Sequence, residues 1–205
     1  MMERHGSGRN LGSGRWVAKH TKEVCVMDCV IEIVDYLPEW AEGFAMEKER
    51  LSGIAGLDAV VFEHVGSTAI PGQQAKPVVD MFVGVNPFRP AAYYKDLLDP
   101  ASYSYVETGM RGRHLFAKST EGIWTHNVHL MPYDEQFHTR NEILLRDYLR
   151  RHPELVEEYG AIKMQAARSA ESMNAYTRAK TAFIQSVVDA AREEKGLPLE
   201  DVWEE

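Results

Sequence analysis

The chain has 205 residues, 44% of them hydrophobic, and a net charge of −8. This length predicts a single domain with tails, and the acidic balance argues against broad nucleic-acid binding, which needs many cations to neutralise phosphates. No apolar run approaches the roughly 18–20 residues of a membrane span. The N-terminus lacks the apolar segment of a secretory signal, so we expect no membrane partner and a cytoplasmic protein.

Residues 1–22 are predicted to form a flexible basic tail. They hold five Lys or Arg residues against Glu3, a net charge of +4 that leaves −12 for the remainder of the chain. Their Gly and Ser content favours a flexible extension over a surface for an anionic partner. Cys25 and Cys29 follow, but without a second cysteine pair nearby they do not indicate a zinc site.

Residues 23–133 are predicted to contain the β-sheet. Apolar, β-branched runs bounded by turn residues indicate strands, and a proline suits the first turn of a helix. The expected elements are a strand at 23–35, a helix from 38 that ends at Gly53 and Gly56, strands at 60–65 and 77–85, a helix at 91–98, and strands at 103–108, 113–118 and 123–131. The last two strands are expected to pair as a hairpin around Gly122.

Residues 139–196 are predicted to be helical. Thr139 and Glu142 form a capping-box pattern at the first helix, Pro153 begins the second, and a third continues to the end of the segment. We expect 23–196 to form one domain and 197–205 to be an acidic tail. Strands joined by short turns favour a mixed sheet. The predicted class is therefore α+β, a mixed β-sheet with flanking helices and a helical C-terminal region.

Asp80 is the first candidate for a functional residue. It lies within the apolar run from Val78 to Val83, and a carboxylate there is costly to bury unless it is paired or holds a metal. Thirteen residues earlier, Gly66 and Ser67 form a turn that can bring backbone N–H groups close to a phosphate. Together they predict a site for a metal-bound nucleotide. The structural alternatives are ordinary turn chemistry and a buried acid paired with a lysine.

Longer motifs carry a family resemblance. The stretches EHVGSTAIPG and KPVVD, the later NEILLRDYLRRHPELVEEYGAIK, and the spacing Tyr176-x-x-x-Lys180-x-x-Phe183-Ile184 resemble the GrpB family. The resemblance runs from about Leu37 to Val188. It implies a nucleotidyltransferase-like fold, and its turn adds Thr68 to the residues expected to bind phosphate.

The sequence differs from the nucleotidyltransferase motif at one acidic position. Nucleotidyltransferases of this type follow the Gly-Ser turn with an Asp-x-Asp or Asp-x-Glu pair on one face of a strand, where it holds two Mg²⁺ ions. Asp80 fills the first position, but Phe82 stands at the second. Three alternatives follow. Glu63 and His129 complete the metal shell, a single Mg²⁺ or Mn²⁺ carried by the triphosphate suffices, or the site binds nucleotide without catalysis.

Other polar residues could complete such a site. Lys76 and Arg113 are candidates for binding phosphate, and His129 for a metal ligand or a general base. Tyr176 and Lys180 could reach the nucleotide from the helical region. The structural alternatives are a solvated lysine, a hydrogen-bonded strand histidine, and a Lys180 that snorkels to solvent.

These residues predict a nucleotidyltransferase that moves a nucleoside monophosphate from a nucleoside triphosphate to an unidentified small-molecule acceptor with Mg²⁺. The alternative is a non-catalytic nucleotide-binding or accessory module of the same fold. GrpB-like regions also resemble a domain attached to an enzyme of coenzyme A synthesis, which favours that alternative, as does Phe82. A plain interaction protein is the third possibility, but it would leave Asp80 buried without a ligand.

Overall fold

The computed structural model describes residues 32–202, apart from the side chain of Met173. Its centre is a five-stranded sheet in the order β1-β2-β5-β4-β3. The strands are β1 (Ala59–Val65), β2 (Val79–Val85), β3 (Tyr103–Val106), β4 (His114–Thr120) and β5 (Ile123–Pro132). Strands β2 and β5 are parallel, while the other neighbouring strands are antiparallel. The predicted mixed sheet is confirmed, including the β4–β5 hairpin at Gly122.

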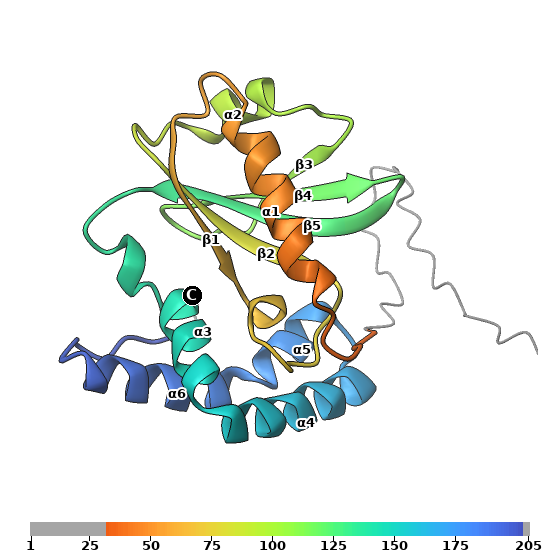
Figure 1. Ribbon diagram of the computed structural model, residues 1–205, viewed down its shortest axis with the longest axis vertical. Helices are drawn as coiled ribbons and strands as arrows, with labels where there is room; N and C mark the ends of the chain where they lie inside the picture. The colour runs from red at the N-terminus through yellow and green to blue at the C-terminus, as the bar shows by residue number, and fades with distance from the viewer. Residues whose placement is uncertain (1–31, 203–205) are drawn as a thin grey trace, which may run out of the picture.

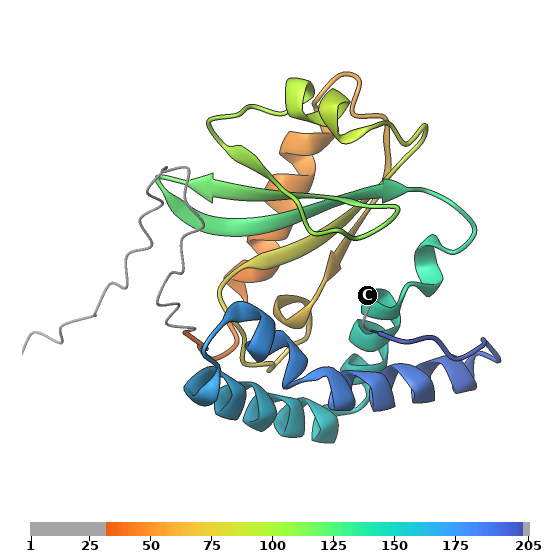
Figure 2. The same ribbon diagram turned by 180° about the vertical axis from the view of Figure 1, so that it is seen from behind.

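Helices surround the sheet on two sides. They are α1 (Glu39–Ser52), α2 (Ala91–Leu97), α3 (Asn141–Arg151), α4 (Pro153–Ser169), α5 (Met173–Arg178) and α6 (Thr181–Glu194), with short 3₁₀ turns η1 (Ser67–Ala69) and η2 (Phe137–Thr139). Figure 1 shows α1 lying across the sheet, and both views show α3 to α6 gathered at its lower end (Figures 1 and 2). The expected α+β architecture with a helical C-terminal region is therefore confirmed.

The two faces of the sheet pack against different parts of the protein, because side chains alternate along each strand. On one face Met81, Val83 and Val85 of β2 join the main core, which includes Leu51 of α1 and Tyr94 of α2. On the opposite face β2 presents Asp80 and Phe82. Phe82 packs in a second, smaller core with Phe137 and Ile143. The acid therefore lies on the face that looks toward the C-terminal helices.

The strand predicted at 23–35 differs from the structure in the part that is described. Within 32–35, only Val34 pairs, through an isolated bridge in which it exchanges two 3.0 Å backbone hydrogen bonds with Ala75. The remainder of that prediction, the basic tail, Cys25 and Cys29 lie outside the described residues, as do 203–205 of the acidic end.

Two predictions about the helices are wrong. The capping box is absent, since α3 starts at Asn141 and its N-cap residue makes no side-chain capping bond. Glu142 instead forms a 2.7 Å ion pair with Arg113. The last helix is also broken in two, because the Lys180 N–H bonds to Thr177 O and tightens the end of α5 into a 3₁₀-type turn.

The division of the chain around residues 133–139 stays a prediction. Strand β5 ends at Pro132 and α3 begins at Asn141, with η2 between them. Within residues 32–202, no helix combines the length and the apolar character needed to cross a lipid bilayer.

Candidate functional site: a lysine-rich pocket beside Asp80

The turn that follows β1 is built around Gly66. Its φ of +71° belongs to the left-handed region that favours glycine. A Cβ atom at this position would lie only 2.5 Å from Asp80 Oδ2. Glycine is therefore required both for the backbone conformation and for the close approach of the Asp80 carboxylate to the turn. The predicted pairing of the Gly-Ser turn with Asp80 is present in the fold.

Asp80 sits between two neighbouring strands, opposite Val65 of β1 and Asn127 of β5. The Asn127 Nδ2 group donates a 2.7 Å hydrogen bond to Asp80 Oδ1. Burial raises the pKa of the Asp80 carboxyl, while the hydrogen bond from Asn127 and the charges of Lys76 and Lys180 oppose that rise. The carboxylate is thus fixed in orientation and surrounded by cations.

Asp80 opens into a cavity of about 250 Å³. The cavity lies between the η1 turn, β2, β5 and helices α4 and α5. Its lining is Ser67, Thr68, Ala75, Lys76, Val78, Asp80, Trp124, Asn127, Lys163, Tyr176, Thr177 and Lys180. Six of the predicted site residues are in this list: Ser67, Thr68, Lys76, Asp80, Tyr176 and Lys180. We call this cavity the lysine pocket.

Three lysines converge on the lysine pocket from different elements. Lys163 of α4 is 1% exposed and donates a hydrogen bond to Gln74 O. Burial, aided by Lys180, lowers the pKa of Lys163 to about 6. Burial also lowers the pKa of Lys180 to about 8, with Asp80 opposing and Lys76 adding to the change. The fold therefore holds more cationic groups in this pocket than its one carboxylate can neutralise.

Aromatic rings line the same pocket. The Lys76 Nζ atom lies 3.7 Å from the centre of the Trp124 ring, and the Lys180 Nζ atom lies 4.0 Å from the centre of the Tyr176 ring. Tyr176 is 5% exposed, and burial raises its pKa to about 12. A lysine over an aromatic face is stabilised by the charge distribution of the ring, which helps to hold both amines in place.

Side chains outside the lysine pocket support the η1 turn. The His64 Nε2 atom and Thr68 Oγ1 are hydrogen-bonded at 3.0 Å. Arg150 of α3 donates two hydrogen bonds, of 2.9 and 2.6 Å, to Ala69 O. Burial, together with Arg150 and Arg146, lowers the pKa of His64 to about 4, so this histidine is neutral near pH 7 and acts as a structural support.

Glu63 shares the sheet face of Asp80, but it does not line the lysine pocket. Arg146 of α3 donates a 2.6 Å hydrogen bond to Glu63 Oε2 and a 2.8 Å bond to His64 O. Glu63 therefore ties α3 to β1 and is not available beside Asp80.

His129 also lies away from the lysine pocket. It stands opposite Phe82, and the two rings meet edge to face with centres 5.4 Å apart. Burial, with Arg113 adding to it, lowers the pKa of His129 to about 4. Arg113 is engaged by Glu142 and lies over the Phe82 ring, so it too is not part of this lining.

The expected metal shell of Asp80, Glu63 and His129 is consequently not assembled. Among residues 32–202 no three His, Cys, Asp or Glu side chains are grouped so that they could hold a metal ion. Mg²⁺ prefers a cage of oxygen ligands, whereas here one carboxylate is surrounded by ammonium groups. The side chains do not fit a resident metal ion, although they leave Asp80 facing any ion that a ligand carries.

The sequence reasoning missed six of the residues that line the lysine pocket, and Asn127, Trp124 and Lys163 are the three of these that contribute most to its chemistry. The sheet register brings Asn127 beside Asp80, which sequence spacing alone does not reveal. The burial of Lys163 could have been predicted, because it follows Tyr159 by four residues and lies on the same helix face as the apolar stripe of α4. A lysine at such a position is rarely buried without a functional or structural reason.

Comparisons with known proteins give a consistent result. The chain is 35% identical to the UPF0157 protein YqkA of Bacillus subtilis (strain 168) over 79% of this chain and 47% of that protein, so it spans about half the length of that relative. The crystal structure of the conserved protein GrpB from Enterococcus faecalis is 29% identical, with a TM-score of 0.72 over 80% of this chain and 99% of that one.

A more distant likeness links the fold to terminal uridylyl transferase 4 from Trypanosoma brucei, solved with bound UTP. It is 17% identical and covers 82% of this chain and 61% of that one, and its TM-score of 0.47 supports no inference by itself. The family model described as GrpB protein matches residues 30–190. That match covers most of the sequence, and the chain belongs to the GrpB family.

Proposed function

We propose that the protein binds a nucleoside triphosphate in the lysine pocket, with the phosphates between the η1 turn and the three lysines. The observation that carries this proposal is the charge imbalance. Lys76, Lys163 and Lys180 line a cavity of about 250 Å³ that holds Asp80 as its one acidic side chain. Burial of amines beside a single carboxylate disfavours their charged forms, and a polyanionic ligand would stabilise those charged forms.

The shifted pKa values support the same proposal. Lys163 and Lys180 have pKa values lowered to about 6 and 8 because burial disfavours their charged forms. A bound phosphate would stabilise the charged forms and raise both values again. The η1 turn adds the Ser67 and Thr68 side chains and its backbone to the same wall.

The aromatic lining supports a nucleotide over inorganic polyphosphate. Trp124 and Tyr176 are exposed to the same cavity, and stacking of a base on an aromatic side chain contributes about 1–3 kcal/mol. We expect Trp124→Ala to weaken binding of a nucleoside triphosphate about tenfold or more and to weaken binding of inorganic triphosphate clearly less, through the lost support of Lys76.

Nucleotidyl transfer is the second candidate, favoured by the position of Asp80 next to the Gly66 turn. In that reaction an acceptor hydroxyl attacks the α-phosphorus, the bond to the bridging oxygen breaks, and pyrophosphate leaves while the hydroxyl proton passes to solvent. The lysines would stabilise the charge on the leaving pyrophosphate. A Mg²⁺ or Mn²⁺ ion carried by the triphosphate would supply further positive charge, and Asp80 is the carboxylate that faces it. Phe82, at the second acidic position, favours binding without transfer.

Thermal stability and calorimetric titration with ATP, GTP, CTP and UTP, each with and without Mg²⁺, test the binding proposal. We expect stabilisation by at least one nucleotide and its loss in Lys180→Met, whereas Lys48→Met on the exposed side of α1 should behave like the wild type. A ligand present at a concentration 100 times its dissociation constant raises the free energy of unfolding by about 2.7 kcal/mol. The absence of binding by all four nucleotides would refute the proposal.

Pyrophosphate release separates the two candidates. The nucleotide that binds is incubated with a panel of small hydroxyl and amine acceptors, and pyrophosphate is measured by a coupled enzyme assay. Release that disappears in Asp80→Asn while the nucleotide still binds would establish transfer. Binding without release across the panel would favour the accessory module.

A further inference from the structure

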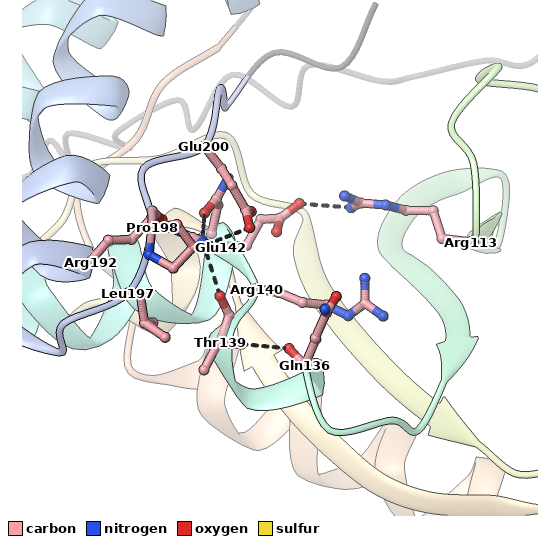
Figure 3. Close-up of a pocket in the computed structure, with 10 residues that line it drawn as sticks. Arg113, Gln136, Thr139, Arg140, Glu142, Arg192, Leu197, Pro198 and Glu200 are labelled. Atoms are coloured by element: carbon pink, nitrogen blue, oxygen red, sulfur yellow. Dashed lines mark hydrogen bonds and ion pairs between the residues drawn. The ribbon is translucent and has the colours of Figure 1, made fainter.

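A second cavity lies at the start of α3, next to the segment that follows α6 (Figure 3). Its volume is about 210 Å³, room for about seven water molecules at the liquid volume of ~30 Å³ each. The lining is Arg113, Gln136, Thr139, Arg140, Asn141, Glu142, Arg192, Leu197, Pro198 and Glu200. None of these residues lines the lysine pocket. We call this cavity the arginine pocket.

Three arginines approach the arginine pocket from different segments, as Figure 3 shows. Arg113 Nη1 lies 2.7 Å from Glu142 Oε1, and Arg192 Nη2 lies 2.5 Å from Glu200 Oε1. Arg140 has the weakest partner, since its Nη2 group lies 3.3 Å from Asp134, a side chain that is 43% exposed and outside the lining. Within residues 32–202, the buried Arg140 Nε atom has no hydrogen-bond partner.

Arg192 is fixed in place without the help of Glu200. Its side chain is 4% exposed, and it donates hydrogen bonds of 2.5 Å to Pro198 O and 2.7 Å to Asn141 Oδ1. The Glu200 side chain, by contrast, is 57% exposed. Gln185 holds the backbone of this residue through a 2.9 Å bond to Glu200 O. The Glu200 carboxylate is therefore a solvent-exposed anion paired with a buried arginine.

We propose that the arginine pocket binds a small dianion, a dicarboxylate or a phosphate monoester, which replaces the Glu200 carboxylate on Arg192 and also engages Arg140. The charge of the lining sets this class of ligand. With Glu200 displaced, Arg192 loses the carboxylate partner of its Nη2 group and Arg140 keeps its 3.3 Å pair with the exposed Asp134, so these two guanidinium groups together suit a ligand with two negative charges. Arginine binds carboxylate and phosphate groups through paired N–H donors, and the Arg140 Nε group supplies an unused one.

In this arrangement Glu200 acts as an internal competitor. Its carboxylate occupies the position that one anionic group of the ligand would take, and Arg140 marks the position of the other. Removing the charge of Glu200 should strengthen ligand binding, whereas removing the charge of Arg140 should weaken it. A purely structural role for the cluster predicts no change in ligand affinity from either substitution.

Titration calorimetry at low ionic strength tests this proposal with succinate as the dicarboxylate, glycerol 3-phosphate as the phosphate monoester and neutral glycerol as the comparator. We expect one of the two dianions to bind and glycerol not to bind. Arg140→Gln should lower the affinity at least about tenfold, since a hydrogen bond to a charged group contributes about 1.5–3 kcal/mol. Glu200→Gln should raise it severalfold. Arg151→Gln, at an exposed pair with Glu194, is the matched control.

The proposal is overturned if neither dianion binds the wild type or Glu200→Gln, or if Arg140→Gln binds as well as the wild type does. Unchanged affinity in Glu200→Gln would refute the competition by the carboxylate. Thermal unfolding of each variant shows that it is folded. Nucleotide titrations in the same variants keep the two proposals apart, because substitutions in the arginine pocket should leave nucleotide affinity unchanged.

Discussion

Replacing Lys163 with methionine should make the protein more stable while it weakens ligand binding. Lys163 is 1% exposed, and burial lowers its pKa from 10.5 to about 6. At pH 7 the lysine is therefore neutral in the folded protein and protonated in the unfolded chain. Methionine has a similar length and carries no charge to lose, so Lys163→Met removes the free-energy cost of deprotonating the buried amine.

The structure gives the magnitude. One pKa unit corresponds to about 1.4 kcal/mol, so the interval between pH 7 and the ordinary lysine pKa of 10.5 amounts to about 5 kcal/mol. Lys163→Met also leaves Gln74 O without its hydrogen bond, a loss of about 1–3 kcal/mol. The net expectation is a gain of about 2–4 kcal/mol, or a rise in Tm of roughly 4–16 °C for a chain of this size.

The dependence on pH provides the sharper test. Between pH 6 and 10.5 the unfolded chain binds one more proton at Lys163 than the folded protein does, so wild-type stability rises with pH relative to the variant. The advantage of Lys163→Met should shrink by about 1.4 kcal/mol for each pH unit from 7 to 9.

Urea unfolding of wild type and Lys163→Met at pH 7, 8 and 9 measures both quantities, with Lys48→Met on exposed α1 as the control for loss of a surface lysine. The reasoning is refuted if Lys163→Met is less stable than the wild type at pH 7. It is equally refuted if the stability difference between the two proteins does not change with pH.

Three further predictions follow from the described contacts. Gly66→Ala should lower the free energy of unfolding in urea by about 2–4 kcal/mol, because it combines a positive φ with a contact of 2.5 Å to Asp80. Gly72→Ala, with φ of +77° and open space around its Cβ, should lower it clearly less. Equal losses in the two variants would contradict the clash with Asp80. Nucleotide affinity measured by calorimetry should fall about a hundredfold from pH 7 to pH 9, because uptake of roughly one proton by Lys163 and Lys180 on binding corresponds to a tenfold loss of affinity for each pH unit. An affinity that does not change with pH would contradict the role of these lysines. Arg146→Met should lower the free energy of unfolding by roughly 2–4 kcal/mol, because the guanidinium group is 8% exposed and bonds to residues of both β1 and α3. A loss below about 0.5 kcal/mol would show that these ion pairs contribute little to stability.

Much of the fold was predictable because its signals are local. Alternating apolar residues gave the strands β1, β2 and β5, and Pro38 and Gly53 mark the two ends of α1. The errors arose where tertiary contacts outweighed local patterns. Glu142 fits a capping box in sequence, but Arg113 from before β4 takes its carboxylate.

The candidate site was predictable only in part, for the same reason. Ser67 and Asp80 lie near the two ends of the connection between the antiparallel strands β1 and β2, so their spacing along the chain is informative. Glu63 and His129 were expected to complete a metal shell with Asp80, and the sheet register does place them on the same face as Asp80. Residues on one sheet face do not all line the same pocket, because side chains from α3 contact some of them. Arg146, for example, forms an ion pair with Glu63. Lys163 enters from α4, more than eighty residues later in the chain. Its place on the apolar stripe of α4 indicates burial, but no local pattern indicates that it approaches Asp80.

Proton uptake on nucleotide binding tests the central claim most directly. The claim is that the buried lysines hold fewer protons than they would beside bound phosphates, because burial lowers the pKa of Lys163 to about 6 and of Lys180 to about 8. Calorimetric titrations with the bound nucleotide at pH 8, in buffers of different ionisation enthalpy, report the number of protons exchanged. We predict a net uptake of roughly one proton in the wild type and less in Lys163→Met. Binding with no uptake, or with proton release, would contradict the account.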